Sequence, residues 1–458
     1  MRLLVVDVGS SAVKAGVWET AGRRAGPRSR VRLAVETRAQ GVCVEVPGER
    51  LLVTVERAIR AALAAAGATR QTSGGGPALD ALLFDTFSPG VVVVDTSRAA
   101  ARNVLRVTAG CITHQDRRSY MEAADIEKQI GRARHLARAG NRPFPGGIGS
   151  TSLLWLRRQR PEVFAPGCKV GMAGSLLNYA WTGNWTIDPS QAAFLGLWDI
   201  RTGRWNAELC AAARVDPATL PEVRPAESEH GRVSAAAARR LGIAAGTPVY
   251  GGLVDTSAAL LATPMHTGQL VHSAGSTDVL ALITARPAAA PDLLTRPLGL
   301  GNPTVPGGGA WLAVSTIAAS GSALDWCRHT LFSELSEAAF RRLVTRVCGR
   351  HDEGDSVRFA PYLAGDRTSL DPVTGAFAGL SLATGRDQML AAVIAGLIEQ
   401  SATRFARLNE VLPARKPVYT MGSNSALAAA MHQAWPRRMT FRPVAGDALG
   451  GLAQLLDR

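Results

Sequence analysis

The sequence has few lysines, few aromatic residues and no long apolar run. Aromatic residues make up 5% of the 458 residues, and the only lysines are Lys14, Lys128, Lys169 and Lys416. No apolar run approaches the ~20 residues that a membrane-spanning helix requires. The chain also reaches Asp7 before the apolar region of a signal peptide is complete. We therefore expect a cytoplasmic protein without a membrane partner.

Cysteine is scarce and scattered along the chain. The cysteines are Cys43, Cys111, Cys168, Cys210, Cys327 and Cys348. Because no two of them are close in sequence, the pattern excludes the usual zinc-binding spacings and a dense disulfide framework. We expect reduced, structural cysteines.

The formal charge of +14 is carried almost wholly by arginine. Such a charge has three explanations, namely a nucleic-acid partner, an anionic substrate or an arginine-rich proteome. The arginines are spread through the chain without the interleaved aromatic residues of a single-strand-binding surface. We therefore favour solvated helix faces and expect no nucleic-acid partner.

The chain is long enough for two domains, and its apolar content of 47% is that of an ordinary globular protein. A boundary fits near residues 246–248, which divides the chain into domains at 1–245 and 246–458. Each part contains a strand, a turn of small hydroxyl residues and a second strand, at residues 5–17 and 271–283. This is a weak internal repeat of architecture.

The first motif with chemical meaning lies at the end of the opening strand. Asp7 ends that strand, Gly9, Ser10 and Ser11 form a turn, and Lys14 returns on the next strand. Such a turn can direct N–H and hydroxyl groups at a phosphate, and Asp7 can hold Mg²⁺ through water. The alternative is a plain hairpin with an Asx-type turn.

A second carboxylate follows the apolar strand Gly251-Gly252-Leu253-Val254. Asp255 stands where a helix of small residues begins, so one interpretation is a helix N-cap. The other is a general base that aligns a substrate hydroxyl and accepts its proton.

Two further turns can bind phosphate or nucleotide. Gly275, Ser276 and Thr277 join two strands, and an ordinary hairpin turn is the alternative there. Gly422, Ser423 and Asn424 lie between a strand and a helix, where backbone N–H groups can face an anion. Most such strand-to-helix turns bind nothing, so each motif is weak alone.

In their joint order these motifs resemble the FGGY family of carbohydrate kinases, in the superfamily of sugar kinases, actin and Hsp70 ATPases. The resemblance spans nearly the whole chain. The matching segments are Asp7-x-Gly9-Ser10-Ser11-x-x-Lys14, Gly251-Gly252-x-x-Asp255, Gly275-Ser276-Thr277, Pro361-Tyr362-Leu363-Ala364-Gly365-Asp366-Arg367-Thr368, Gly422-Ser423-Asn424-Ser425 and Ala448-Leu449-Gly450-Gly451-Leu452-Ala453.

The resemblance implies two ribonuclease H-like (actin-like ATPase) α/β domains with the active site in the cleft between them. It implies ATP and Mg²⁺ as cofactors, a small sugar as substrate, and transfer of the γ-phosphoryl group to a hydroxyl. Asp255 would be the catalytic base and contact the sugar, and Asp7 would organise Mg²⁺. The implied nucleotide-binding positions are Asp7, Gly9, Ser10, Ser11, Lys14, Gly275, Ser276, Thr277, Gly422, Ser423 and Asn424.

The family's sugar site maps onto two further segments. The matching sugar-binding positions are Thr86 and Phe87 in a hairpin, and Asp116 and Arg118 in an Asp-x-Arg element. A carboxylate and a guanidinium together serve the donors and acceptors of sugar hydroxyls. The alternative for Asp116 and Arg118 is a surface ion pair.

Three departures from the family pattern bear on the ligands. Met421 replaces a common glycine, which bears on the nucleotide. The tryptophan that often precedes the Asp-x-Arg element is absent, and the hairpin at residues 85–90 differs from common pentulose-kinase forms. We expect a xylulose-like pentulose first, with ribulose, sedoheptulose, glycerol, erythritol and gluconate as alternatives.

Two other classes of function are alternatives to a kinase. A non-catalytic sugar- or ATP-binding protein on the same fold would bind without turnover. Nucleic-acid binding would give salt-sensitive retention of RNA or DNA. Whether the chain forms a homodimer stays open.

Overall fold

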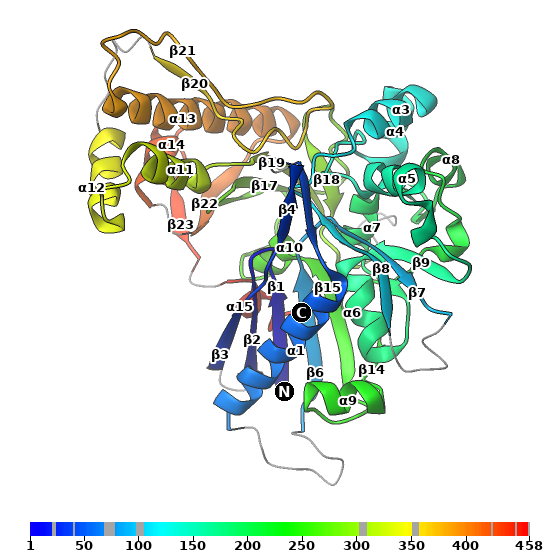
Figure 1. The fold of residues 1–458 in the computed structure, drawn as a ribbon. Helices are drawn as coiled ribbons and strands as arrows, with labels where there is room; N and C mark the ends of the chain where they lie inside the picture. Colours follow the sequence, from blue (N-terminus) through cyan, green and yellow to red (C-terminus); the bar gives the residue numbers. More distant parts are fainter. Residues whose placement is uncertain are drawn as a thin grey trace.

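Two six-stranded β-sheets organise the protein (Figure 1). The computed structural model describes residues 1–20, 24–39, 42–67, 78–97, 105–301, 309–349, 357–422, 425–444 and 447–456. In spatial order, the first sheet contains β14 (Gly231–Arg232), β15 (Pro248–Val254), β6 (Ala81–Thr86), β1 (Arg2–Val8), β2 (Ala12–Glu19) and β3 (Arg24–Arg32). The second contains β18 (Leu294–Pro297), β19 (Trp311–Ile317), β17 (Asp278–Thr284), β16 (Gln269–Ala274), β22 (Arg415–Gly422) and β23 (Phe441–Pro443).

The two sheets repeat one pattern. In each, a central strand, β1 or β16, pairs antiparallel with the next strand along the chain and parallel with a later one, β6 or β22. A third antiparallel strand, β3 or β19, and a second parallel strand, β15 or β23, complete the repeat. This confirms the expected α/β class with two ribonuclease H-like domains.

Alternating side chains of β1 pack on opposite faces of the first sheet, as the pleat of a strand requires. Leu4 and Val6 share a core with α1 (Gly48–Ala65). Leu3 and Val5 share another with α10 (Asp255–Leu260) and α15 (Ala448–Leu452). Because both faces are covered, the strand is an almost unbroken apolar run.

Helices also cover the second sheet. Phe405 and Leu408 of α13 (Arg386–Val411) pack on Leu270, Leu280 and Leu282 of its strands. Figure 1 shows these helices together in the upper left lobe. They are α11 (Gly321–Leu331), α12 (Glu337–Cys348), α13 (Arg386–Val411) and α14 (Ser425–Ala434).

A third, five-stranded sheet and several helices form the right-hand part of Figure 1. Its strands are β4 (Glu36–Arg38), β5 (Cys43–Val46), β8 (Arg106–Thr113), β7 (Gly90–Asp95) and β9 (Cys168–Met172). The helices are α3 (Tyr120–Ile130), α4 (Arg132–Ala139), α5 (Gly149–Gln159), α6 (Ala173–Thr182), α7 (Pro189–Leu195), α8 (Ala207–Ala212) and α9 (Ala235–Leu241). Short strands elsewhere are β10 (Thr186–Ile187), β11 (Trp198–Asp199), β12 (Arg204–Trp205), β13 (Glu222–Val223), β20 (Arg358–Ala360) and β21 (Ala376–Ala378).

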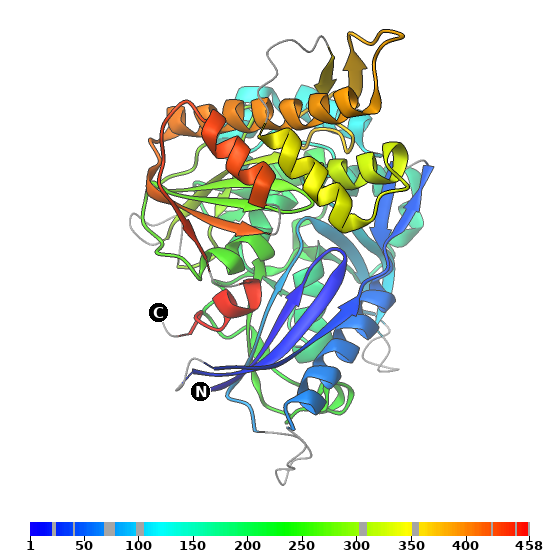
Figure 2. The ribbon, with the colours of Figure 1, turned by 90° about the vertical axis from the view of Figure 1, so that its left-hand side faces the viewer.

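The predicted boundary between residues 245 and 246 stays a prediction. Strand β15 follows that point in the chain, yet it pairs with β6 in the first sheet. Helix α15, close to the C-terminus, also packs against the first sheet, and Figure 2 shows it between the two lobes. The chain therefore passes to the second sheet after Val254 and returns to the first one at its end.

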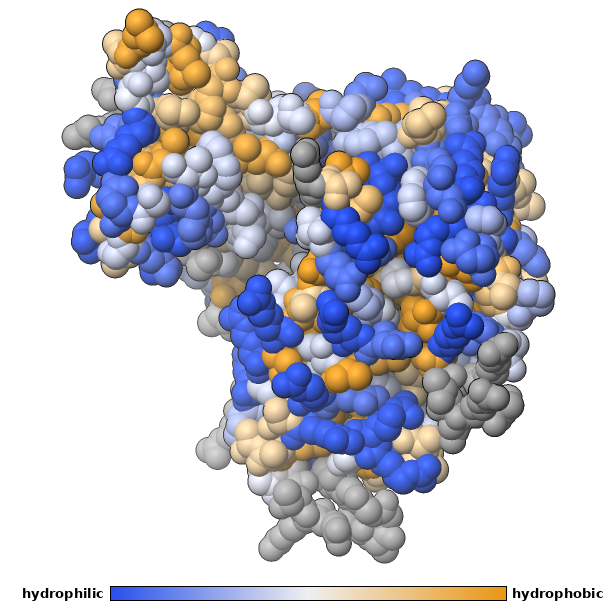
Figure 3. All heavy atoms as spheres, in the orientation of Figure 1, coloured by the Kyte–Doolittle hydropathy of each residue, from blue (hydrophilic) through white to orange (hydrophobic). Residues whose placement is uncertain are grey.

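Within the described ranges, no helix is long and apolar enough to span a membrane. All six cysteines are unpaired, as expected. Hydrophilic residues cover much of the face seen in Figure 3, which is notched between the lobe of α11–α14 and the lobe of β1–β3.

Candidate active site

Three neighbouring parallel strands bring carboxylates to one edge of the first sheet. Asp7 near the end of β1 lies beside Asp85 near the end of β6, and Val254, the last residue of β15, lies beside Thr86. Asp255 follows Val254 directly. The carboxyl ends of parallel strands are where ligands of α/β proteins commonly bind, and a cavity of about 490 Å³ opens there, lined by Asp7 and Asp255.

Asp7 is paired across the first hairpin. The Lys14 Nζ donates to Asp7 Oδ2 over 2.7 Å, and the two residues face each other in the β1–β2 register. Burial alone would lower the pKa of Lys14, but the Asp7 carboxylate outweighs it and the net pKa is raised. Lys14 is therefore a firmly charged cation at the cavity.

Asp85 is the carboxylate to which the sequence analysis assigned no role. Its side chain is fully buried, and no N–H or hydroxyl group of the described residues donates to its carboxylate oxygens. Burial raises its pKa well above the ordinary value, and the charges of Asp7 and Asp255 raise it further. The signal for it was its position near the end of a buried strand, as for Asp7.

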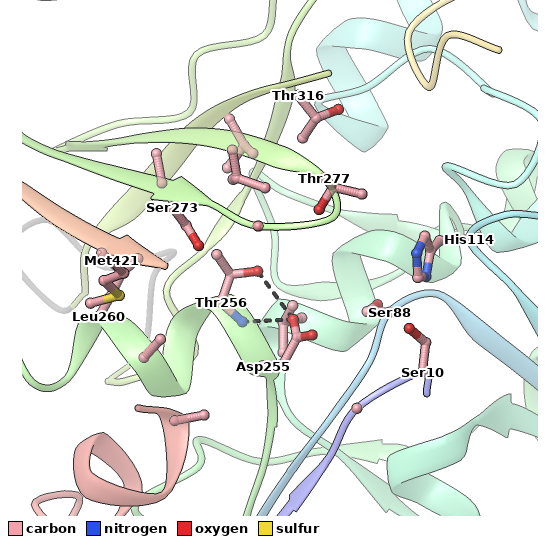
Figure 4. A pocket seen from close by; sticks show the side chains of 18 of the residues that line it. Ser10, Ser88, His114, Asp255, Thr256, Leu260, Ser273, Thr277, Thr316 and Met421 are labelled. Atoms are coloured by element: carbon pink, nitrogen blue, oxygen red, sulfur yellow. Dashed lines mark hydrogen bonds between the residues drawn. The ribbon is translucent and has the colours of Figure 1, made fainter. Parts of the chain in front are cut away.

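Asp255 opens α10 and faces the cavity (Figure 4). Its Oδ1 accepts from the Thr256 N–H over 2.7 Å and from Thr256 Oγ1 over 3.1 Å. The N-cap position belongs to Val254, so Asp255 does not cap the helix. Burial raises its pKa, and the charge of Asp7 adds to that effect. Because both bonds use Oδ1, Oδ2 remains for a ligand.

Two glycines deliver Asp255 to this position. Gly251 has φ of +104° and Gly252 has φ of +81°, and the β15–β6 register shifts between Gly251 and Leu253. A Cβ on Gly251 would lie 2.2 Å from the carbonyl oxygen of Phe84. Only glycine allows this approach with a left-handed backbone, which explains the Gly-Gly pair of the motif.

The two small-residue turns face the same cavity from the two sheets. Gly9, Ser10 and Ser11 join β1 to β2, Gly275, Ser276 and Thr277 join β16 to β17, and all six line the cavity. The second turn is held by the start of α11, because the N–H groups of Ser320, Gly321 and Ser322 donate to carbonyls of Gly275 and Ser276. The structure therefore brings together the two turns that the sequence analysis singled out.

The third predicted turn lies only partly within the described residues. Gly422 ends β22 beside Ala274, with φ of +107° and a Cβ position 2.0 Å from the Ala274 carbonyl oxygen. Met421 lines the cavity. Ser423 and Asn424 lie outside the described residues, so their roles stay predictions.

Of the five predicted sugar-binding residues, Asp255 lines the cavity and the other four do not. Thr86 is buried and its hydroxyl accepts from Gln191 Nε2 over 2.6 Å. Phe87 is 1% exposed within an apolar core. Asp116 is fully buried and accepts from Arg118 Nε over 2.8 Å. Their roles in binding sugar stay predictions, and in this structure each has a structural contact.

Neighbouring residues of those two segments do line the cavity, namely Ser88, His114 and Gln115. The His114 Nδ1 is buried without a hydrogen-bond partner. Burial lowers the pKa of His114 well below its usual value, and the charges of Arg367 and Arg117 lower it further. His114 therefore faces the cavity as a neutral imidazole, opposite Asp255 in Figure 4.

The guanidinium groups of Arg296 and Arg367 also line the cavity, and the sequence alone indicated a role for neither. Burial lowers the pKa of Arg296 and of Arg367 to about 10. Arg296 donates to Ser257 Oγ, and Arg367 Nη2 donates to the Ser88 carbonyl over 3.4 Å. No carboxylate among the described residues forms an ion pair with either. Arg367 lay in a quoted motif, whereas no sequence signal marked Arg296.

The carboxylates at the cavity are candidate ligands for a metal ion. Among the described residues, no group of three or more His, Cys, Asp or Glu side chains could hold a metal by itself. Mg²⁺ usually takes only one or two carboxylates and completes its shell with water and phosphate oxygens. Asp7 and Asp255 at the cavity, with Asp85 beside Asp7 in the sheet, fit a Mg²⁺ that arrives with a phosphate group.

Comparison with known proteins identifies similar chains. The model of the FGGY family of carbohydrate kinases, N-terminal domain, matches residues 2–262. The xylulose kinase of Lactococcus lactis is 25% identical over 398 residues, which cover 86% of this chain and 74% of that protein. The gluconokinase of Bacillus subtilis is 24% identical over 313 residues, which cover 66% of this chain and 60% of that protein.

Solved structures show the same fold. The crystal structure of xylulose kinase from Rhodospirillum rubrum has a TM-score of 0.82 at 22% identity, covering 100% of this chain and 89% of that one. Plasmodium falciparum glycerol kinase with ADP has a TM-score of 0.80 at 14% identity, covering 98% of this chain and 88% of that one. At these identities the likeness establishes the two-domain architecture alone.

Proposed function

The chain belongs to the FGGY family of carbohydrate kinases, and we propose that it transfers the γ-phosphoryl group of ATP to a hydroxyl of a small sugar. One observation supports this most directly. A carboxylate with one free oxygen, Asp255, faces a cavity that small-residue turns from both sheets also line. Phosphoryl transfer to an alcohol needs such a base beside donors for the phosphate.

Asp255 is the general base of the proposed reaction. Its Thr256 contacts hold Oδ1, so Oδ2 accepts the proton of the sugar hydroxyl as that oxygen attacks phosphorus. A carboxylate with a raised pKa is a stronger base than an ordinary one once it is ionised. Asp255 thereby both orients the nucleophile and takes its proton.

The two turns hold the phosphate groups in this proposal. Ser10 and Ser11 approach from the first sheet and Ser276 and Thr277 from the second, each with hydroxyl and N–H donors. Lys14 adds a positive charge that Asp7 keeps in place. Gly9 and Gly275 allow the backbone to come close to an anion.

Asp7 would hold Mg²⁺ through water, with Asp255 at the same edge of the first sheet. When bound with ATP, the ion neutralises charge on the phosphoryl oxygens. Closure of the cleft between the two sheets should exclude water, because an open site would let ATP be hydrolysed.

The acceptor has two candidates. The names of several relatives, among them the Lactococcus lactis protein, point to a pentulose such as xylulose. A sugar acid is the second candidate, because Arg296 and Arg367 line the cavity without an ion-pair partner among the described residues. Guanidinium groups at a cavity can bind the carboxylate of a sugar acid, and two relatives are named gluconokinase.

ADP release from ATP–Mg²⁺ tests the proposal, measured with xylulose, ribulose, sedoheptulose, glycerol, erythritol and gluconate. Sorbitol, the neutral counterpart of gluconate, is the matched control for the sugar-acid candidate. We expect one sugar to drive turnover, and Asp255→Asn to lower kcat by about 10²–10⁴-fold. Binding of sugar and ATP without turnover would instead indicate a non-catalytic protein, and an unchanged rate in Asp255→Asn would refute the role of the base.

A further inference from the structure

A series of three polar side chains, two of them buried and one partly buried, crosses the second domain behind the cavity. The His272 Nε2 lies 2.6 Å from Asp278 Oδ2, and the His272 Nδ1 lies 2.7 Å from His432 Nε2. His272 and Asp278 are 0% and 1% exposed. None of the three lines the cavity, and the proposed reaction uses none of them.

The carboxylate of Asp278 determines which group donates in the first hydrogen bond. A carboxylate accepts, so His272 donates to Asp278 through its Nε2–H. The Nδ1 of His272 and the Nε2 of His432 share the second hydrogen bond, and either ring can supply its proton. Burial, and then the neighbouring His272, lower the pKa of His432 to about 3, so this ring is neutral. Two hydrogen bonds thus link the three side chains, and the first of them ends on a carboxylate.

The first bond bridges the two strands on either side of the phosphate turn. His272 stands in β16, just before the turn at residues 275–277, and Asp278 opens β17 directly after it. In the antiparallel register Ala274 lies opposite Asp278, so His272 reaches it diagonally. The bond therefore holds the base of the turn that carries Ser276 and Thr277.

The second bond reaches the helix that follows Gly422. His432 lies in α14, which begins three residues after Gly422 at the end of β22. Its ring stacks on Phe441 with centroids 3.8 Å apart, and it meets Trp435 edge-on at 4.7 Å. Trp435 in turn donates to Ser401 Oγ of α13 over 3.1 Å. The rings prevent His432 from swinging away from His272.

A purely apolar cluster would fill this space without the cost of burying His272 and Asp278, which is offset only when both are hydrogen-bonded. The hydrogen bonds between the three side chains fix distances and angles, whereas apolar contacts would allow the joined elements to slide past one another. The two elements joined in this way are the phosphate turn and the helix behind Gly422.

We propose that Asp278, His272 and His432 are positioning residues that hold the phosphate turn and α14 in register, and so set the affinity for the nucleotide. The inference rests on the proposed kinase function, which places ATP between the turn at 275–277 and Gly422. None of the three residues touches the nucleotide. The sugar, bound on the side of the first sheet, does not depend on them.

Titration with ADP in the presence of Mg²⁺, together with KM values for ATP and for the sugar, tests the proposal in the full chain. His432→Leu removes the hydrogen-bonding group, and His432→Gln keeps an amide, which can donate or accept, near the position of Nε2. We expect His432→Leu to raise the Kd of ADP and the KM of ATP by about 5–10-fold, with kcat and the sugar KM unchanged. His432→Gln should stay within about twofold of the unchanged chain.

His230→Leu is the matched control. His230 is also fully buried and its Nδ1 lies 3.0 Å from Thr186 Oγ1, but it precedes β14 in the first sheet. Its loss should lower stability without a selective change in nucleotide affinity. If His432→Leu does not fold, His432→Met takes its place, because a thioether fills the space without an N–H donor.

Three outcomes would overturn the inference. In the first, His432→Leu or His432→Met binds ADP as the unchanged chain does. In the second, His432→Gln binds ADP as weakly as His432→Leu does, so that the imidazole ring and not the hydrogen bond sets the affinity. In the third, His230→Leu weakens ADP binding equally. If the unchanged chain neither binds ADP nor phosphorylates any sugar, the proposed function itself fails, and this inference with it.

Discussion

Replacing Gly251 by alanine tests how closely the backbone of β15 controls the position of Asp255. An alanine Cβ there would lie 2.2 Å from the Phe84 carbonyl oxygen. Contacts of this kind need about 3.0 Å, so β15 must move away from β6 by roughly 0.8 Å. The left-handed φ of +104° adds strain of about 1–2 kcal/mol for any residue with a Cβ.

This shift occurs only four residues before the proposed base. A displacement of about 1 Å at a catalytic group can cost about 10²-fold in rate. We therefore expect Gly251→Ala to lower kcat/KM by about 10²-fold, and the free energy of unfolding by about 2–4 kcal/mol. The assays are sugar-dependent ADP release and urea denaturation.

Gly246→Ala is the control for this prediction. Gly246 also has a left-handed backbone, with φ of +82°, but nothing lies within 4 Å of its Cβ position. It should lose about 1–2 kcal/mol of stability through strain and keep its activity. The reasoning is refuted if Gly251→Ala retains full activity, or if Gly246→Ala loses as much activity as Gly251→Ala.

Two further predictions concern pH. Burial and the charge of Asp7 raise the pKa of Asp255, and the charge of Arg296 opposes them. Arg296→Met should therefore raise that pKa further and move the acid limb of the kcat/KM profile to higher pH. An unmoved limb would show that Arg296 does not act on the base. Burial lowers the pKa of His230 to about 4, so between about pH 4 and 6.5 the unfolded chain binds a proton that the folded chain does not. The free energy of unfolding should therefore fall on acidification through this range, by up to about 1.4 kcal/mol per pH unit, and His230→Gln should flatten that slope in urea titrations.

The sequence by itself was sufficient to predict those features that are local in the chain. Asp7 and Lys14 stand on one hairpin, so their meeting follows from strand pairing alone. The turn at residues 275–277 likewise lies between two adjacent strands. The repeated strand-turn-strand pattern and the order of the motifs were enough to predict two similar domains, the family and Asp255 as the candidate base.

The sequence reached the two sugar-site segments but did not settle which of their residues face the cavity. These residues lie in the segments that follow β6 and β8, where no strand periodicity predicts which side chains face the cavity. Phe87 packs in the core while Ser88 lines the cavity. Likewise Asp116 is held by Arg118 and the Val44 N–H, while His114 and Gln115 line the cavity.

Only the tertiary structure decided which groups from distant segments meet at the site. Asp85 joins Asp7 because β6 pairs in parallel with β1, and parallel neighbours are joined by long connections that leave no local pattern. Arg296 and Arg367 reach the cavity from separate elements of the second part of the chain, and His432 meets His272 by helix packing. Their pKa values follow from burial, which is a property of the folded chain. Local pairing and periodicity are written in the sequence, whereas electrostatic contact between distant segments arises only when the sheets and helices pack.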